Sequence, residues 1–255
     1  MQLTFLGTGT SYGIPMIGCE CEVCRSESTF NKRLRSSVIL SYNGKFVLID
    51  TTPDLRTQLL NNPVPHIDAV LFTHHHADHL FGIDDIRIFN RIQKSSIPCF
   101  GSKLTIDTLR KSFDYIFNGY TPKGGGLPSL ELYELDSGIS FDLFAKEIIP
   151  VPIMHGNLEI YGYRWDKIAY ITDCSFISDT SLSMLEKLDI LVINGLRYKP
   201  HPTHHSIPDA INIVTKLQPK KAYLTHISHE IDHIKVNSEL PENIYLAYDG
   251  LVLNI

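Results

Sequence analysis

The feature that most constrains this chain is a cluster of metal-binding residue types directly after a short apolar run. Residues 68–72 read DAVLF, which is typical of a buried strand, and residues 74–79 read HHHADH, the pattern H-x-H-x-D-H. Because side chains two positions apart in a strand share a face, His74 and His76 point to the same side. A turn near Asp78 brings Asp78 and His79 beside them. Imidazole and carboxylate groups suit zinc, manganese or iron, so the segment predicts a site that can hold two adjacent metal ions.

Apolar runs of strand length alternate with helical patterns along almost the whole chain. We expect strands at residues 1–6, 37–41, 46–49, 68–72, 148–151, 168–171, 190–193, 222–224, 244–248 and 251–253. The Asn43-Gly44 pair predicts a hairpin turn between the second and third of these. Helices are expected from about 79 to 93, around 109–116, and from 207, where Ser206 and Asp209 match a capping box. The expected architecture is layered, with sheets inside and helices outside.

Size and charge limit the kinds of partner. A length of 255 residues allows one large domain or two small ones, and the net charge of −5 excludes a broadly basic nucleic-acid coat. No stretch approaches the roughly 18 apolar residues of a membrane-spanning helix. Residues 1–6, MQLTFL, lack the positive region of a signal peptide. We therefore expect a cytoplasmic protein that binds neither membranes nor nucleic acid.

Three of the five cysteines form a second candidate metal site. Cys19, Cys21 and Cys24 follow the pattern C-x-C-x-x-C, which lacks only one ligand for a closed tetrahedral zinc. His229 is a possible fourth ligand, and the alternative is a loop of reduced cysteines without metal. The isolated Cys99 and Cys174 are expected in the core, because free cysteine is often buried.

The ordered histidine and aspartate motifs of this chain resemble those of the metallo-β-lactamase superfamily. The resemblance implies an αββα sandwich (class α/β), a single hydrolase domain over residues 1–255 and a dinuclear centre at one edge of the sheets. It assigns Asp50 to a position beside the ligands, where it orients one of them. It implies that a hydroxide bridging two divalent ions (zinc, manganese or iron) is the nucleophile. The implied metal ligands are His74, His76 and His155 for one ion, Asp78, His79 and His226 for the other, and Asp173 between them.

Within the superfamily, the cysteine cluster makes the chain similar to PhnP-like phosphodiesterases. Those enzymes pair such a cluster with a histidine next to the last active-site ligand. The resemblance implies one structural zinc, in a small loop at about 17–30, held by Cys19, Cys21, Cys24 and His229. It also implies hydrolysis of five-membered cyclic phosphates on ribose, notably 5-phosphoribosyl 1,2-cyclic phosphate. The expected partner is thus a small phosphorylated substrate, and a homodimer is suggested by the resemblance alone.

A histidine-rich loop supplies the expected proton donor. Residues 201–206 read HPTHHS and lie between an expected strand and the capped helix. PhnP-like enzymes carry a general-acid histidine in the matching loop. By its distance to the helix, His204 matches that residue best, and His201 is the alternative. The expected catalytic residues are therefore His204 and the metal ligand Asp78.

Two further segments have open interpretations. Lys32, Arg33 and Arg35 are either a solvated basic face or a clamp for a substrate phosphate, with Arg35 favoured for the clamp. Residues 118–128 are rich in glycine and proline, which predicts a surface loop or a lid that carries Tyr120 or Lys123 over the substrate.

Three other functions share part of the pattern. An RNase Z-like nucleic-acid phosphodiesterase has the same core motifs, but no long basic arm for gripping tRNA is present. A thioester or lactone hydrolase shares the core without explaining the cysteines. A non-catalytic metal-binding protein would not need an open dinuclear ligand set.

Overall fold

Two seven-stranded sheets form the centre of the computed structural model, which describes residues 1–121 and 126–255. In the first sheet the strand order is β14-β1-β2-β3-β4-β5-β6, and in the second it is β13-β12-β11-β10-β9-β8-β7. The strands of the first sheet are β1 Gln2–Gly7, β2 Ser37–Tyr42, β3 Lys45–Ile49, β4 Ala69–Leu71, β5 Ile97–Gly101, β6 Leu130–Glu134 and β14 Val252–Asn254. Those of the second are β7 Phe141–Asp142, β8 Glu147–His155, β9 Leu158–Trp165, β10 Ile168–Ile171, β11 Ile190–Asn194, β12 Lys221–Thr225 and β13 Ile244–Leu246.

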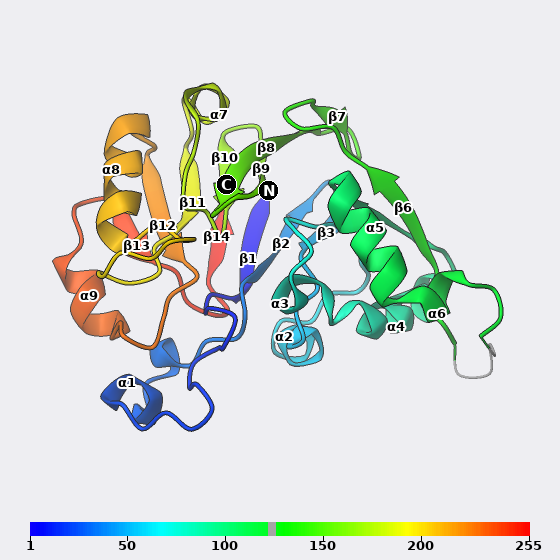
Figure 1. Ribbon diagram of the computed structural model, residues 1–255, viewed down its shortest axis with the longest axis horizontal. Helices are drawn as coiled ribbons and strands as arrows, with labels where there is room; N and C mark the ends of the chain where they lie inside the picture. Colours follow the sequence, from blue (N-terminus) through cyan, green and yellow to red (C-terminus); the bar gives the residue numbers. More distant parts are fainter. Residues whose placement is uncertain (122–125) are drawn as a thin grey trace.

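Helices cover the outer faces of both sheets (Figure 1). The helices beside the first sheet are α2 Leu55–Asn61, α3 Ala77–Leu80, α4 Arg87–Gln93, α5 Lys103–Ser112 and α6 Asp114–Phe117, with a 3₁₀ turn at Ile83–Ile86. Those beside the second sheet are α7 Asp179–Ser183, α8 Ile207–Leu217 and α9 His233–Glu239. The short α1 Glu22–Arg25 and a 3₁₀ turn at Thr29–Asn31 belong to a loop that extends below the sheets (Figure 1).

The buried side chains form one layer between the sheets and one beneath the helices on each side. Trp165 and Tyr163 lie between the sheets, Ile207 of α8 packs on the second sheet, and Leu109 of α5 packs on the first. Burial of both faces explains why these strands are nearly continuous apolar runs. The expected αββα sandwich is confirmed.

Most of the expected elements are present, with one clear exception. The Asn43-Gly44 turn has positive φ at both residues (50° and 72°), and the capping box of Ser206 and Asp209 is formed. The single helix expected from about 79 to 93 is wrong, because the chain breaks at Gly82. The backbone N–H of Gly82 donates to the carbonyl of Thr51 at 2.9 Å and not to a carbonyl of the preceding helical turn, so the helix stops there. A Cβ on Gly82 would lie 1.9 Å from the carbonyl oxygen of Thr52, so this close approach requires glycine.

The structure does not test the expected lid, the localisation or the homodimer. Tyr120 is 92% exposed, and Lys123 lies outside the described residues, so the interpretation of 118–128 as a lid stays a prediction. Within 1–121 and 126–255, the helices are all too short or too polar to cross a membrane. Cytoplasmic localisation and a homodimer likewise stay predictions.

Candidate metal centres

Strand ends from both sheets bring the expected ligands of the dinuclear centre together. Parallel pairing of β3 with β4, of β10 with β11, and of β11 with β12 places their carboxyl ends at one edge. Three of the residues that follow these strands adopt a left-handed backbone, with φ of 64° at Asp50, 57° at Asp173 and 57° at His226. An aspartate or histidine with a left-handed backbone is uncommon. Such residues persist where the surrounding structure holds them in that conformation, and they gather at functional sites.

The first group consists of His74, His76 and His155, whose ligand atoms lie within 4.8 Å of one another. His155 donates from Nδ1 to the backbone carbonyl of Thr203 at 2.8 Å, which leaves Nε2 free for another partner. Nε2 of His74 is buried and has no hydrogen-bond partner within the described part of the chain. A buried unpaired acceptor is costly unless something binds it. This orphaned nitrogen is the observation that best fits a metal ion.

The second group is centred on Asp173, as the resemblance implies. One carboxylate oxygen of Asp173 lies 3.3 Å from Nε2 of His226, and the other lies 3.4 Å from Nε2 of His79. Oδ2 of Asp78 is also 3.4 Å from Nε2 of His79. The chain folds so that all seven expected ligands gather in this region, and the donor set of imidazoles and carboxylates suits divalent metals. That these residues bind metal stays a prediction.

Asp50 lies behind the second group and orients it. Its Oδ2 accepts from Nδ1 of His79 at 2.7 Å, and the same carboxylate accepts from the backbone N–H and the hydroxyl of Thr73 at 2.8 and 2.7 Å. A carboxylate on the far nitrogen fixes the tautomer and the ring orientation of a ligating histidine. This arrangement agrees with the role that the resemblance gives to Asp50.

The charges in the centre are strongly coupled. Burial lowers the pKa of His79, but its carboxylate neighbours, Asp173 foremost, raise that pKa well above its ordinary value. Burial raises the pKa of Asp173, whereas His226 and His79 lower it, and the net pKa is well below the usual range. Burial lowers the pKa of His226 to about 4 and that of His74 well below its ordinary value. Burial thus favours the neutral, metal-binding form of His226 and His74, whereas the carboxylates favour the protonated form of His79, which must lose its Nε2 proton to bind a metal ion.

The structure distinguishes the two candidate proton donors. Nε2 of His204 lies 3.2 Å from Oδ1 of Asp173, and its ring stacks on that of His226 with centroids 4.8 Å apart. His201 is one step further out, with its Nδ1 3.1 Å from Nδ1 of His204. Proximity to the centre favours His204. His204 also groups with His155 and Asp173 within 4.8 Å, so its position suits either metal binding or proton donation.

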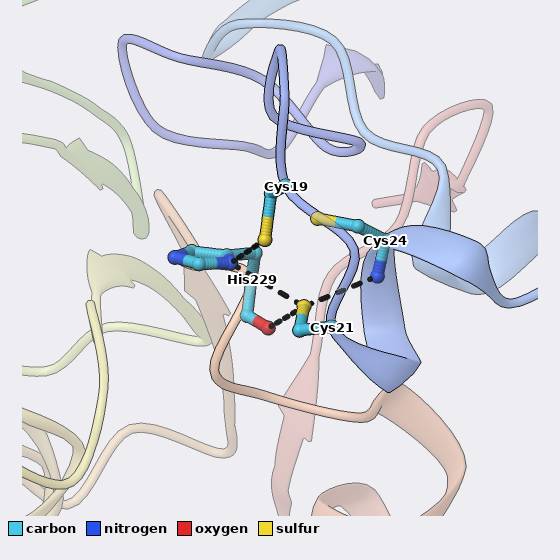
Figure 2. Close-up of side chains that lie close together, drawn as sticks. All are labelled: Cys19, Cys21, Cys24 and His229. Atoms are coloured by element: carbon cyan, nitrogen blue, oxygen red, sulfur yellow. Dashed lines mark hydrogen bonds between the residues drawn. The ribbon is translucent and has the colours of Figure 1, made fainter.

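The cysteine cluster forms as expected (Figure 2). Sγ of Cys19 and of Cys21 lie 3.3 and 3.4 Å from Nδ1 of His229, and these three residues with Cys24 place their ligand atoms within 4.8 Å of one another. Zinc bonds of about 2.3 Å to sulfur and ~2.0 Å to nitrogen require spacings of about 3.6 Å in a tetrahedron, so the cluster fits zinc. The backbone N–H of Cys24 lowers the pKa of Cys21 to about 6, while burial raises that of Cys24 to about 11. Cys99 and Cys174 are both fully buried in the core, as expected.

The three residues of the expected basic patch differ in exposure: Lys32 is exposed, Arg35 is half-buried and Arg33 is buried. Arg33 is 2% exposed and donates to the hydroxyl of Thr8 and to the backbone carbonyl of Ala247, each at 2.6 Å. Arg35 pairs with Asp54 at 2.8 Å. Arg33 is therefore not part of a solvated face, whereas the role of Arg35 as a phosphate clamp stays a prediction. Their spacing in the sequence gave no sign of these distant partners.

A cleft of about 280 Å³ opens beside His204 and His226. His201 and His229, both candidates from the sequence, also line it. The other walls were not expected from the sequence, namely Thr10, Ser11, Tyr12, Met16, Leu196, Arg197, Ser228 and Glu230. A larger cavity of about 490 Å³ lies between α2 and α4, but it contains none of the candidate ligands. The smaller cleft is therefore the candidate substrate pocket. Thr203 was also missed: its backbone carbonyl, which accepts from His155, leaves no sequence signal, and its hydroxyl contacts the neighbouring His204.

The chain is similar to several known proteins. The family model described as "Beta-lactamase superfamily domain" matches residues 45–227. A solved structure described as a new diphosphatase from the PhnP family is 44% identical, covers 100% of this chain and 97% of that one, and has a TM-score of 0.93. The short form of human tRNase Z shares the fold at 20% identity, with 100% and 99% of the two chains covered and a TM-score of 0.73.

A further relative is named as a different kind of enzyme. An octanoyltransferase from Porphyromonas gingivalis is 37% identical over 259 residues. The match covers 98% of this chain but 51% of the relative, so the chain spans about half the length of that protein.

Proposed function

The chain belongs to the β-lactamase superfamily and, within it, to the PhnP family; it is a metal-dependent hydrolase, and we propose that it cleaves cyclic phosphate esters of ribose. Three features support this substrate class. The PhnP-family relative is a diphosphatase, so a phosphate is attacked in a protein 44% identical to this one. The candidate pocket is small, and its walls offer hydroxyl, imidazole and guanidinium donors for an anion.

The centre around Asp173 is the observation that carries the proposal. His74, His76 and His155 would hold one divalent ion, and Asp78, His79 and His226 the other, with Asp173 shared. Such ions, when bound, neutralise charge on a phosphate and lower the pKa of water. The protein's own part is to orient the ligands: Asp50 holds the His79 ring, and the carbonyl of Thr203 holds that of His155.

His204 is the proposed proton donor. Opening a ribose cyclic phosphate expels an alkoxide of high pKa, which needs a proton as the ester bond breaks. Nε2 of His204 lies at the mouth of the centre, 3.2 Å from Asp173, and the ring also lines the pocket. Behind it, the hydroxyl of Thr203 lies 2.9 Å from Nδ1 of His204 and holds the ring in place. The donated proton would pass from His204 to the leaving oxygen of the sugar.

A hydrolysis panel tests the proposal. It compares 5-phosphoribosyl 1,2-cyclic phosphate, 2′,3′-cyclic nucleotides, bis(p-nitrophenyl) phosphate, a tRNA precursor and an octanoyl thioester, each with zinc, manganese or iron supplied. We expect the highest kcat/KM on the ribose cyclic phosphates. Preferred cleavage of the tRNA precursor or of the thioester would contradict it.

Thioester hydrolysis is the second candidate, because the Porphyromonas gingivalis relative is named an octanoyltransferase. A pocket for an octanoyl chain should be apolar, because burying its methylene groups supplies the affinity. The candidate pocket instead contains Arg197, Glu230 and four histidines. The polar lining therefore favours the phosphate ester.

A further inference from the structure

One residue belongs to both candidate sites. His229 contributes Nδ1 to the cysteine cluster, and its side chain also lines the candidate substrate pocket with His204 and His226. In Figure 2 the second nitrogen of the His229 ring points away from the three sulfur atoms. Across residues 1–121 and 126–255, no hydrogen bond is made to that Nε2 atom, and the side chain is only half-buried. The ring therefore has a polar atom that the cysteine cluster does not use, in a side chain that lines the pocket.

Ligation at Nδ1 decides what that atom can do. A neutral imidazole bound to a metal through one nitrogen carries its proton on the other, so Nε2 of His229 can only donate. The two thiol contacts at 3.3 and 3.4 Å hold the ring, which makes it a donor of fixed direction. A rigid donor loses little conformational entropy when a ligand binds. The complementary ligand group is one that only accepts, such as a phosphate oxygen.

The turn between the two sites sets the distance over which a substrate would extend. His226 and His229 are three residues apart, so their Cα atoms lie at most ~10 Å from each other. The turn is fixed, because the backbone N–H of Ile227 donates to the carbonyl of Thr8 at 2.9 Å and the Ile227 side chain is fully buried. A pentose with a phosphate at each end is of this size. The pocket volume of about 280 Å³ also suits a small molecule better than a polynucleotide.

We propose that His229 is a substrate-binding residue as well as a zinc ligand: its Nε2–H donates to the phosphate at the far end of a phosphorylated ribose while the other end reaches the dinuclear centre. The inference rests on the proposed function for the identity of the substrate. Through His229, the cysteine site would contribute to substrate specificity. Arg197 also lines this end of the pocket, where Glu230 holds it at 2.7 Å.

A pair of variants separates zinc binding from hydrogen bonding. His229→Cys keeps four zinc ligands and removes the Nε2–H donor, because zinc accepts four thiolates. Ser28→Ala is the matched control, in the same loop and outside the four candidate zinc ligands. Elemental analysis should show that both variants retain the wild-type zinc content. Ribose 5-phosphate is the probe, with ribose as the ligand that lacks the phosphate.

The first measurements need no turnover. In wild-type protein labelled with ¹⁵N-histidine, the Nε2–H signal of His229 should shift on addition of ribose 5-phosphate and not of ribose. By calorimetry, His229→Cys should weaken ribose 5-phosphate binding ~10–100-fold, the value of one hydrogen bond to a charged group. Ser28→Ala should bind as the wild type does. An unshifted His229 signal, unchanged affinity in a zinc-loaded His229→Cys protein, or equal losses in both variants would each overturn the inference.

Kinetics then separate this inference from the proposed function. His229→Cys should raise KM for 5-phosphoribosyl 1,2-cyclic phosphate ~10–100-fold more than KM for bis(p-nitrophenyl) phosphate, which has no second phosphate. Wild-type protein that binds ribose 5-phosphate through His229 but hydrolyses no phosphodiester would overturn the proposed function and leave the inference standing. Wild-type hydrolysis with equal changes of KM on both substrates would overturn the inference alone.

Discussion

The two candidate metal sites are built in opposite ways. The centre around Asp173 gathers residues from 74 to 226, at the ends of strands in both sheets, and most of its side chains are buried. The cysteine cluster takes three ligands from six consecutive residues of a loop and only His229 from elsewhere. The first site therefore exists only when both sheets are in place, whereas the second requires one loop and one turn. Damage to the first should remove chemistry, and damage to the second should remove local order and substrate discrimination.

The largest effect should follow from Asp78→Ala. If Asp78 holds the second ion, its loss removes several kcal/mol of charge stabilisation, or about 10⁴-fold in kcat on every phosphodiester. Elemental analysis should show less metal in the dinuclear centre and unchanged zinc in the cysteine site. Asp85→Ala, in the 3₁₀ turn that follows, is the matched control. Wild-type turnover by a folded Asp78→Ala protein would remove the dinuclear mechanism and, with it, the contrast between the two sites.

His204→Ala should act on the chemistry selectively. Loss of a general acid costs ~10²–10⁴-fold where the leaving group is a poor one, and much less where p-nitrophenolate leaves. We would measure kcat for 5-phosphoribosyl 1,2-cyclic phosphate and for bis(p-nitrophenyl) phosphate, with His201→Ala as the comparison. Equal losses on both substrates would assign His204 to metal or substrate binding. A selective loss confined to His201→Ala would assign proton donation to His201.

Asp50→Asn tests whether the hydrogen bond from His79 to Asp50 supports the dinuclear centre. The amide keeps the shape of the carboxylate but removes its charge from the hydrogen bond of 2.7 Å to His79. Changes of this kind cost about 10–100-fold in metal affinity or activity. Metal titration of the apo protein should show the loss, and Asp84→Asn, on the protein surface, should not. An Asp50→Asn protein with unaltered metal affinity would mean that His79 needs no such support.

Cys21→Ser should have the smallest effect on turnover of bis(p-nitrophenyl) phosphate, less than about tenfold, because the loop contributes no ligand to the dinuclear centre. One zinc per chain should be lost, and Tm should fall by ~2–4 °C for each kcal/mol of stability removed. Ser28→Ala, in the same loop, is the control for calorimetry and elemental analysis. Full zinc content in Cys21→Ser would show that the cysteine site is wrongly assigned.

The sequence by itself determined the local parts of both sites. The spacings of 74–79 and 19–24 specify ligand types that must lie close together whatever the fold, because few residues separate them. Apolar runs predicted most strands, since a strand covered on both faces must be apolar throughout. The distant ligands His155, Asp173, His226 and His229 came from the family resemblance, and the structure places them where it implies.

Tertiary structure alone decided what depends on contacts between distant segments. Arg33 looked like a surface charge, but it is buried against Thr8 and Ala247. The expected long helix is broken at Gly82, whose N–H donates to the carbonyl of Thr51, and nothing within 79–93 encodes that neighbour. The place of His229 in the substrate pocket likewise depends on packing between the N-terminal loop and the turn after β12. The residue pattern of the sequence shows which faces of a strand or helix are buried. Which segment covers each face is decided by how the sheets and loops pack in space.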